Sequence, residues 1–234
     1  LSKKLGRNKV RHLKGGGFNF EKYNKYNKNK LRKKHQISKN LKLLVHVGRY
    51  NKTKGVEDIF KVFETLFKSN KELMFVFIGG DKEDPLYNIL RADLRSYEEQ
   101  GRAIITGQRI PKVEVIELIS LSDVYVTFYD TNQKINMTNF GDVDNSILEA
   151  LAMNIPVVSP TLTHIPCTKQ ELRDLGFVAR NKEELLKYTT FLLNNHEKYN
   201  VSRKIIRKYF SWKYIINQNS SVYKELANNY YDSF

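Results

Sequence analysis

Short apolar runs alternate with amphipathic segments along most of this 234-residue chain. Each run has the length of a buried strand, and the segments between the runs carry apolar residues at the spacing of one helix face. This alternation is typical of βα units, whose strands pair in parallel, so we predict an α/β fold. The predicted strands lie at 43–47, 73–78, 103–106, 123–129, 156–158 and 176–179. The predicted helices lie at 56–67, 85–99 and 146–153, with one more starting at Pro111 and a helical region from 183 onward.

The ends of these strands indicate where a ligand would bind. Parallel sheets bind ligands beyond the carboxyl ends of their strands. In this chain those ends carry Gly48, Gly79-Gly80, Gly107 and the polar stretch 130–145. We therefore expect the binding residues in and around these loops.

Basic charge is concentrated at the start of the chain. The formal net charge is +15, and residues 1–42 hold 15 of the 40 Lys and Arg residues but one of the 25 acids. The remainder is close to neutral. We interpret 1–40 as a basic lead-in or interdomain linker segment, with one short strand near 10–13 and some irregular structure. Residues 41–234 then form the folded domain with its C-terminal helices.

Solvated charge, anionic lipid and nucleic acid are three interpretations of the lead-in segment. Tyr23 and Tyr26 lie among its lysines, and aromatic residues among cations can stack on single-stranded nucleic acid. The segment matches no nucleic-acid-binding fold, and richness in Lys and Asn runs through the whole sequence. Nucleic acid is therefore the least favoured of the three, anionic lipid comes next, and solvated charge is the favoured interpretation.

Composition excludes several other classes of protein. The chain is 41% hydrophobic, which suffices for a buried core. No run approaches the roughly 18 apolar residues of a membrane-spanning helix. Cys167 is the single cysteine, so an internal disulfide and a cysteine-only metal site are excluded, and a reducing compartment is expected. The five histidines show no metal-ligand spacing.

Two cations follow the first predicted strand. Arg49 comes directly after Gly48, and Lys54 precedes the next helix. Arg offers a planar fork of donors and Lys a mobile point charge, which suits the two phosphates of a nucleoside diphosphate. Lys and Arg are abundant here, so on their own these two residues are better interpreted as solvated loop charges.

A second group of candidate residues surrounds the start of the helix at 146–153. Asp144 or Asn145 is a good N-cap, and a helix N-terminus offers free N–H groups and a positive dipole end to phosphate. Glu149 lies one turn inside this helix, where its carboxylate could accept two hydrogen bonds from a ribose diol. The alternative interpretation, an exposed helical glutamate, has equal weight.

The order of these motifs resembles glycosyltransferase family 4, the retaining sugar-nucleotide enzymes of GT-B fold. The run from Val47 to Arg49, followed by Lys54-Gly55, resembles the "VGR…KG" opening of that family's C-terminal domain. The run from Asn145 to Ala152, followed by Pro156-Val157-Val158, resembles its "N(V/S)xLEAxAxGxPV" segment. Shorter resemblances lie at 16–23, 77–80, 104–107, 121–126 and 210–212. The match is collinear over roughly 10–228, and this shared order makes it specific.

The resemblance implies a fold and an activity. The fold would be a Rossmann-like three-layer parallel sheet with C-terminal helices, the donor-binding C-terminal half of a GT-B enzyme. The activity would be retaining transfer of a glycosyl group from UDP-sugar or GDP-sugar to a polysaccharide or glycolipid acceptor, as in a hexosyltransferase. Family members need no metal, and none is expected here.

The same resemblance assigns roles to individual residues. Arg49 and Lys54 would bind the diphosphate, together with the backbone amides of Asn145, Ser146 and Ile147. Glu149 would hold the ribose hydroxyls. The backbone near Gln108 and Arg109 would meet the edge of the base. The sequence departs from the family at Gly141, where the first glutamate of its E-x7-E pair is expected, and the adjacent Asp142 is our candidate for that role.

The resemblance also suggests what surrounds this domain. The N-terminal half of a GT-B enzyme, which supplies the acceptor site, has no counterpart in the sequence, so we expect this chain to be a fragment that is inactive alone. A cytoplasmic location is expected, with peripheral contact at the inner face of the cell membrane, where family members use lipid-linked acceptors. A non-catalytic nucleotide-binding or interaction module is the alternative, because Gly141 replaces an acid. A basic nucleic-acid-binding protein is a less favoured one.

Overall fold

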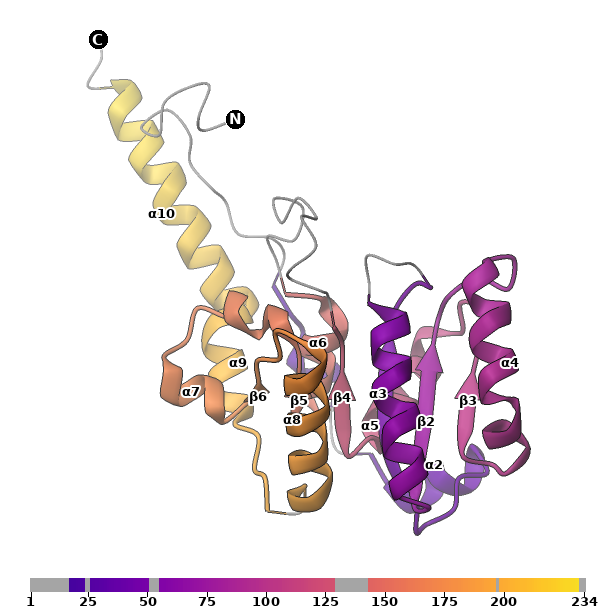
Figure 1. The fold of residues 1–234 in the computed structure, drawn as a ribbon. Coiled ribbons are helices and arrows are strands. Elements are labelled where there is room, and N and C mark those ends of the chain that lie inside the picture. Colours follow the sequence, from indigo (N-terminus) through magenta and orange to yellow (C-terminus); the bar gives the residue numbers. More distant parts are fainter. Residues whose placement is uncertain (1–16, 24–25, 51–54, 129–142, 197, 232–234) are drawn as a thin grey trace.

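A six-stranded sheet, with every neighbouring pair of strands parallel, runs through the centre of the protein (Figure 1). The computed structural model describes residues 17–23, 26–50, 55–128, 143–196 and 198–231. The strand order is β3-β2-β1-β4-β5-β6. The strands are β1 (Lys42–Val47), β2 (Leu73–Ile78), β3 (Ala103–Ile105), β4 (Val124–Val126), β5 (Val157–Val158) and β6 (Gly176–Phe177). The predicted α/β fold is confirmed, although β4 is shorter than the predicted 123–129.

Helices cover both faces of the sheet and make three layers. One face carries α3 (Val56–Ser69), α4 (Pro85–Glu99) and α8 (Lys182–Asn195). The other carries α2 (Lys28–Lys34), α5 (Lys112–Leu121), α6 (Asn145–Ala152) and α9 (Arg203–Phe210). Shorter helical segments are η2 (Phe20–Lys22), η5 (Pro160–His164) and α7 (Lys169–Arg173), and α10 (Trp212–Tyr231) projects from the body (Figure 1). Within the part of the chain that the structure describes, no helix has the length and apolar character needed to cross a bilayer.

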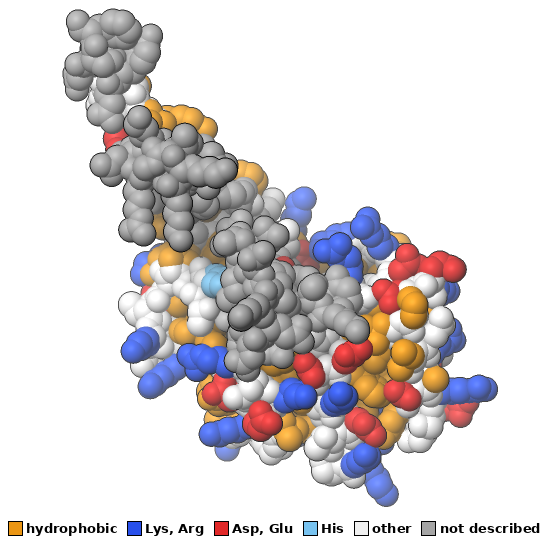
Figure 2. All heavy atoms as spheres, turned by 45° about the horizontal axis from the view of Figure 1, so that its top comes forward, with side chains coloured by type: hydrophobic (Ala, Val, Ile, Leu, Met, Phe, Trp, Pro, Cys, Tyr) orange, Lys and Arg blue, Asp and Glu red, His pale blue; other side chains and the backbone are white. Residues whose placement is uncertain are grey.

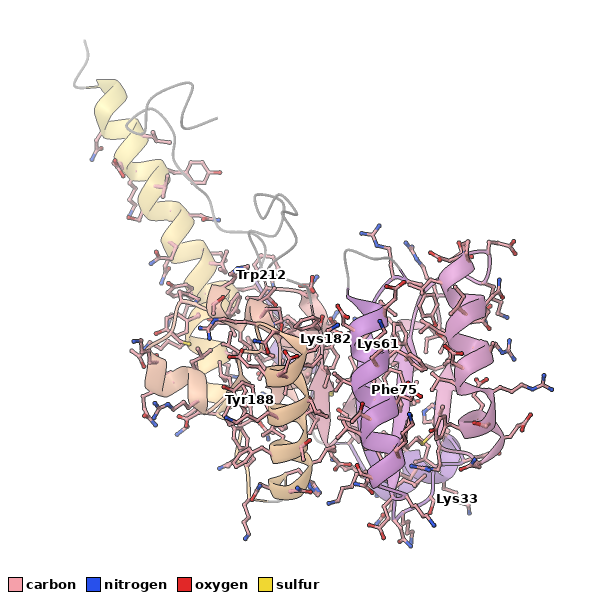
Figure 3. The ribbon with its side chains drawn as sticks, viewed as in Figure 1. Lys33, Lys61, Phe75, Lys182, Tyr188 and Trp212 are labelled. Carbon is pink, nitrogen blue, oxygen red and sulfur yellow. The ribbon has the colours of Figure 1, made fainter. Side chains whose placement is uncertain are left out.

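Side chains that alternate along the strands pack into two separate hydrophobic cores, one on each face of the sheet. In β1, Leu43 and Val45 pack beneath α5 and α6, whereas Leu44 packs on the opposite side beneath α3. Phe75 of β2 stacks on Phe63 of α3 in that second core (Figure 3). Burial of both faces explains why these strands are continuously apolar in the sequence.

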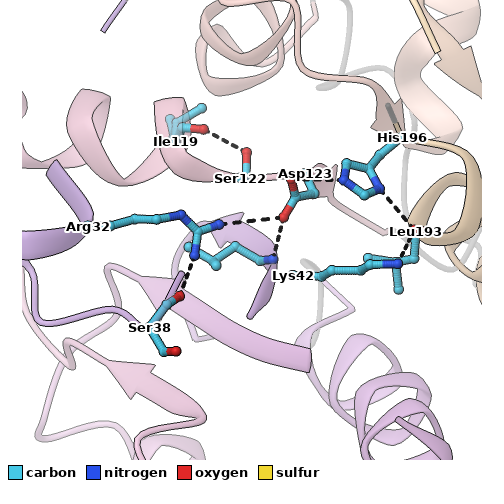
Figure 4. A network of polar contacts seen from close by, with 9 residues as sticks. Arg32, Ser38, Lys42, Ile119, Ser122, Asp123, Leu193 and His196 are labelled. Carbon is cyan, nitrogen blue, oxygen red and sulfur yellow. Dashed lines mark hydrogen bonds and ion pairs between the residues drawn. The ribbon is translucent and has the colours of Figure 1, made fainter. Parts of the chain in front are cut away.

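Asp123 joins the amino ends of the two central strands (Figure 4). Its carboxylate accepts a hydrogen bond from the Leu43 N–H at 2.8 Å, and its own N–H donates to the Leu43 carbonyl at 2.9 Å. Arg32 of α2 lies 3.9 Å from the carboxylate, and His196, at the end of α8, lies 3.6 Å away. One side chain therefore ties β1 and β4 to helices on both faces.

The lead-in segment contributes to the fold more than its composition suggests. Residues 28–34 form α2, a helix that the sequence pattern does not predict, and the Asn27 side chain caps it. Leu31 and Ile37 are buried in the core. Lys34 pairs with Glu117 of α5 at 2.6 Å. Part of the basic charge thus serves internal contacts, while the strand predicted near 10–13 lies outside the described residues.

Aromatic side chains fill the carboxyl edge of the sheet around β2 and β3. The Tyr50 ring packs against Gly80, and its hydroxyl accepts a hydrogen bond from the Gly107 N–H at 3.3 Å. The Tyr87 ring lies over Gly107. Gly80 and Gly107 therefore make room for aromatic rings at this edge.

Replacing Gly80 with alanine should destabilise the protein by about 2 kcal/mol. Gly80 has φ +79°, and an added Cβ would lie 1.5 Å from the buried Tyr50 ring. The matched control is Gly101→Ala, at φ +66° in open space, which should cost only about 1 kcal/mol. Urea unfolding of both variants measures the difference, and equal losses would contradict the proposed packing role of Gly80.

Replacing Asp123 with alanine should cost about 3 kcal/mol, because Arg32 and the Leu43 N–H lose a nearly buried partner. Asp123→Asn should cost less, since the amide oxygen can still accept from Leu43. Urea unfolding again measures both variants. If Asn and Ala are equally destabilising, the bond to Leu43 is not what joins the strands.

Candidate functional site

The strand order reverses at the junction of β1 and β4, and open parallel sheets bind ligands beyond the carboxyl ends of the strands at such a point. The loops that follow these strands meet there. Gly55, directly before α3, has φ +55°, and an added Cβ would lie 2.6 Å from the Phe128 carbonyl oxygen after β4. Figure 2 turns this end of the sheet towards the viewer and shows Lys and Arg side chains gathered beside the grey residues.

The end of β1 presents one predicted cation to this region. Arg49 is exposed, and it forms no ion pair with any other residue in the described ranges. His46 holds the end of β1 against β4 through a 2.8 Å contact between its Nδ1 and the Val126 carbonyl oxygen. A Cβ at Gly48 would lie 2.5 Å from the His46 ring, so this glycine allows the imidazole to pack. Lys54 lies outside the described residues.

The N-terminus of α6 supplies two of the three predicted amides. Asp144 is its N-cap residue, and the Ile147 N–H already donates to the Asp144 carbonyl at 3.0 Å. The N–H groups of Asn145 and Ser146 have no hydrogen-bond partner within the described residues, and they lie at the positive end of the helix dipole. Asp142, like Lys54, falls outside the described part of the chain.

Tyr125 connects this helix end to β1. Burial raises the pKa of Tyr125 above its ordinary range, and the Ser146 side chain and the backbone of Val47 oppose that rise. The two groups that oppose the rise belong to the start of α6 and the end of β1. The structure thus brings the start of α6 next to the end of β1, which bears Gly48 and Arg49.

Glu149 is the most unusual side chain at this site, because it is a carboxylate that is only 3% exposed. The interpretation of Glu149 as an exposed helical residue is wrong. Its Oε1 contacts Lys112 Nζ of α5 and accepts a hydrogen bond from the Tyr23 hydroxyl at 3.2 Å. Its Oε2 is buried without a hydrogen-bond partner among the described residues. A buried acceptor without a partner is costly, and it marks a position where a ligand could donate.

Sequence reasoning missed Tyr23 and Lys112 as members of this site. Tyr23 lies 126 residues from Glu149 in the sequence, within the lead-in segment. Burial and the Glu149 charge raise the pKa of Tyr23, so its hydroxyl stays protonated and able to donate. Lys112 follows Pro111 at the start of α5, and no feature of the sequence distinguishes it from the other lysines.

The turn after β3 is anchored beside the same edge of the sheet. Gln108 forms a bridge with Gly79, and the Thr106 hydroxyl lies 3.0 Å from the Gln108 carbonyl oxygen. An added Cβ at Gly79 would lie 2.5 Å from the Gly48 carbonyl oxygen, so this turn is close to the end of β1. Gln108 and Arg109 are both exposed. The structure therefore places the predicted base-contacting backbone along the same rim.

The described side chains do not gather into a metal-binding cluster. Groups of three or more His, Cys, Asp and Glu residues placed to hold a metal ion are absent from the residues that the structure describes.

Comparison with solved structures identifies similar folds among glycosyltransferases. A glycosyltransferase from Rickettsia africae superposes with a TM-score of 0.68 at 17% identity, covering 97% of this chain and 59% of that one. Anabaena Alr3699/HepE in complex with UDP-glucose gives a TM-score of 0.70 at 16% identity, covering 95% of this chain and 60% of that one. At these identities the likeness establishes the fold alone.

Comparison with known protein sequences identifies the family of this chain. The chain is 23% identical over 215 residues to N-acetyl-alpha-D-glucosaminyl L-malate synthase of Bacillus anthracis, covering 88% of this chain and 51% of that protein. It thus spans about half the length of this curated relative. The family described as Glycosyl transferases group 1 matches residues 27–209, well over half of the chain. The protein therefore belongs to the Glycosyl transferases group 1 family.

Proposed function

We propose that this chain is the donor-binding C-terminal half of a retaining glycosyltransferase of family 4. The observation that carries the proposal is the start of α6. Within the described residues, the Asn145 and Ser146 amides of its first turn and the Oε2 of the buried Glu149, one turn further in, have no hydrogen-bond partner. Both features lie at the point where an open parallel sheet binds ligands.

The phosphates of the donor would bind between the end of β1 and the start of α6. Arg49 is an exposed cation there, and the amides of Asn145 and Ser146 add two donors at a positive helix end. Lys54 is proposed from the sequence alone. These groups would stabilise the negative charge that develops on the leaving nucleoside diphosphate when the glycosyl bond breaks.

The nucleoside would extend from α6 towards the turn after β3. Glu149 Oε2 would accept a hydrogen bond from a ribose hydroxyl, and the backbone at Gln108 and Arg109 would face the base. UDP is the first nucleotide to test, because Anabaena Alr3699/HepE has been solved in complex with UDP and with UDP-glucose. GDP is the second.

The remaining parts of the proposal rest on the family resemblance. Asp142 would contact the donor sugar in place of the acid that Gly141 replaces. The acceptor, a polysaccharide or glycolipid, would bind to a separate N-terminal domain, without which this chain would be inactive. The protein would need no metal and would work in the cytoplasm, at the inner face of the membrane.

A second candidate function is a nucleotide-binding module without transferase activity. Gly141 favours it, because a glycine cannot replace the carboxylate that the family places at that position.

Arg49→Ala should weaken UDP binding by about tenfold, because one charge-assisted contact to phosphate is lost. Isothermal titration calorimetry with UDP, and then with GDP, measures the affinity. Arg95→Ala is the matched control, since Arg95 is an exposed arginine on α4 that pairs with Glu99. Unchanged affinity in Arg49→Ala, or no binding of either nucleotide to the unmodified chain, would contradict the assigned site.

Joining this chain to an N-terminal acceptor domain should restore release of UDP from a UDP-sugar. The measurement is UDP production over time, with Glu149→Gln as the variant expected to lose activity. Intact UDP binding with no UDP release would instead support the non-catalytic module.

A further inference from the structure

We propose that Tyr23 and Lys112 are positioning residues for Glu149, which hold its Oε1 and leave Oε2 as the single oxygen offered to the ribose. This inference rests on the proposed function, since it assumes that a nucleoside diphosphate binds at α6. It adds a role for the lead-in segment and for the start of α5. The charges and hydrogen bonds around Glu149 support this inference.

Both contacts converge on the same oxygen of the carboxylate. Tyr23 donates its hydroxyl to Oε1 at 3.2 Å, and Lys112 places its ammonium on Oε1 as well. A free carboxylate can rotate and accept through either oxygen. With one oxygen engaged twice, the other is held in a fixed orientation. Oε2 then meets the ligand without first losing rotational freedom.

Lys112 also supplies the charge that a buried carboxylate requires. Glu149 has a side chain only 3% exposed, whereas the Lys112 side chain is 60% exposed. An ionised carboxylate in such a position is costly without a cation beside it. Lys112 supplies this cation, while its own stem reaches in from solvent.

Tyr23 is held firmly enough to orient another group. Its side chain is 8% exposed and stacks on Phe18 with ring centroids 4.7 Å apart. The segment around it is fixed to α9, because Arg203 donates to the Phe20 carbonyl and the Phe18 N–H donates to the Phe210 carbonyl at 2.7 Å. The Tyr23 hydroxyl is thus presented from a docked segment.

This arrangement makes the ribose contact depend on elements far from it in sequence. The segment 17–23 lies alongside α9 and the start of α10, where Trp212 closely approaches Gly17. Displacement of the segment would withdraw the Tyr23 hydroxyl and release Glu149. The lead-in segment therefore acts on donor binding without touching the donor.

The test combines a variant with a modified ligand. Tyr23→Phe keeps the ring and removes the hydroxyl, and calorimetry compares its affinity for UDP and for 2′,3′-dideoxy-UDP, which lacks the ribose hydroxyls. We expect about tenfold weaker UDP binding and unchanged binding of the dideoxy analogue. A purely structural loss would weaken both ligands equally and would overturn the positioning role.

Tyr26→Phe is the matched control, because the Tyr26 hydroxyl lies in the same segment but donates to the Lys22 carbonyl at 3.4 Å. Its affinities for both ligands should equal those of the unmodified chain. Urea unfolding of both variants shows whether the fold is kept. A loss in Tyr26→Phe as large as that in Tyr23→Phe would also overturn the inference.

Lys112→Gln tests the second positioning residue with the same two ligands. A loss confined to UDP supports its action through Glu149, whereas an equal loss for the dideoxy analogue would mean that Lys112 contacts phosphate instead and would overturn its assignment. Lys169→Gln is the control, since Lys169 is an exposed lysine at the first position of α7.

The outcomes separate this inference from the function on which it rests. If the unmodified chain binds neither UDP nor GDP, the proposed function fails and the inference fails with it. If UDP binds and Tyr23→Phe changes nothing, only the inference fails. If GDP binds in place of UDP, the same comparison is made with 2′,3′-dideoxy-GDP.

Discussion

The pairing of β1 with β4 is the constraint on which the rest of the structure depends. The two strands come from distant parts of the chain, and a polar contact holds the pair together at each end. Asp123 bonds the Leu43 backbone at the amino ends, and His46 contacts the Val126 carbonyl at the carboxyl ends. Since the strand order reverses at this pair, the two contacts also position the candidate site.

Aromatic packing fills part of the carboxyl edge beside that junction. Tyr50 and Tyr87 occupy the space beside Gly80 and Gly107, so the edge around β2 and β3 is filled with aromatic rings. The start of α6 is different, because free amides and a buried carboxylate lie together there. Aromatic packing and polar groups thus share one edge of the sheet, and within the described residues two unpaired amides and the unpaired Glu149 Oε2 lie at the start of α6.

Several features of the fold and site could be predicted from the sequence. Strands β1 and β2 are long apolar runs that end at glycine, and the helix pattern from Val56 is regular. Local periodicity was therefore sufficient to predict these three elements. The helix α2 was missed because its single buried leucine, Leu31, leaves almost no pattern. Arg49, Asn145 and Ser146 could be proposed because phosphate chemistry favours cations and helix ends after strands. The packing of aromatic rings on Gly80 and Gly107 could not be predicted, since a glycine beside a ligand and one beside an aromatic ring look alike in sequence.

The sequence by itself determined the parallel α/β architecture and the motif order of a glycosyltransferase, because periodicity and spacing are local properties. Only the tertiary structure decided the environment of Glu149. Whether a helical glutamate is exposed or buried depends on what packs over it, and here the covering groups are Tyr23, from 126 residues earlier, and Lys112, from a different helix. Contacts between such distant residues leave no recognisable pattern in a single sequence. The orientation of the Glu149 carboxylate is therefore visible only in the folded chain.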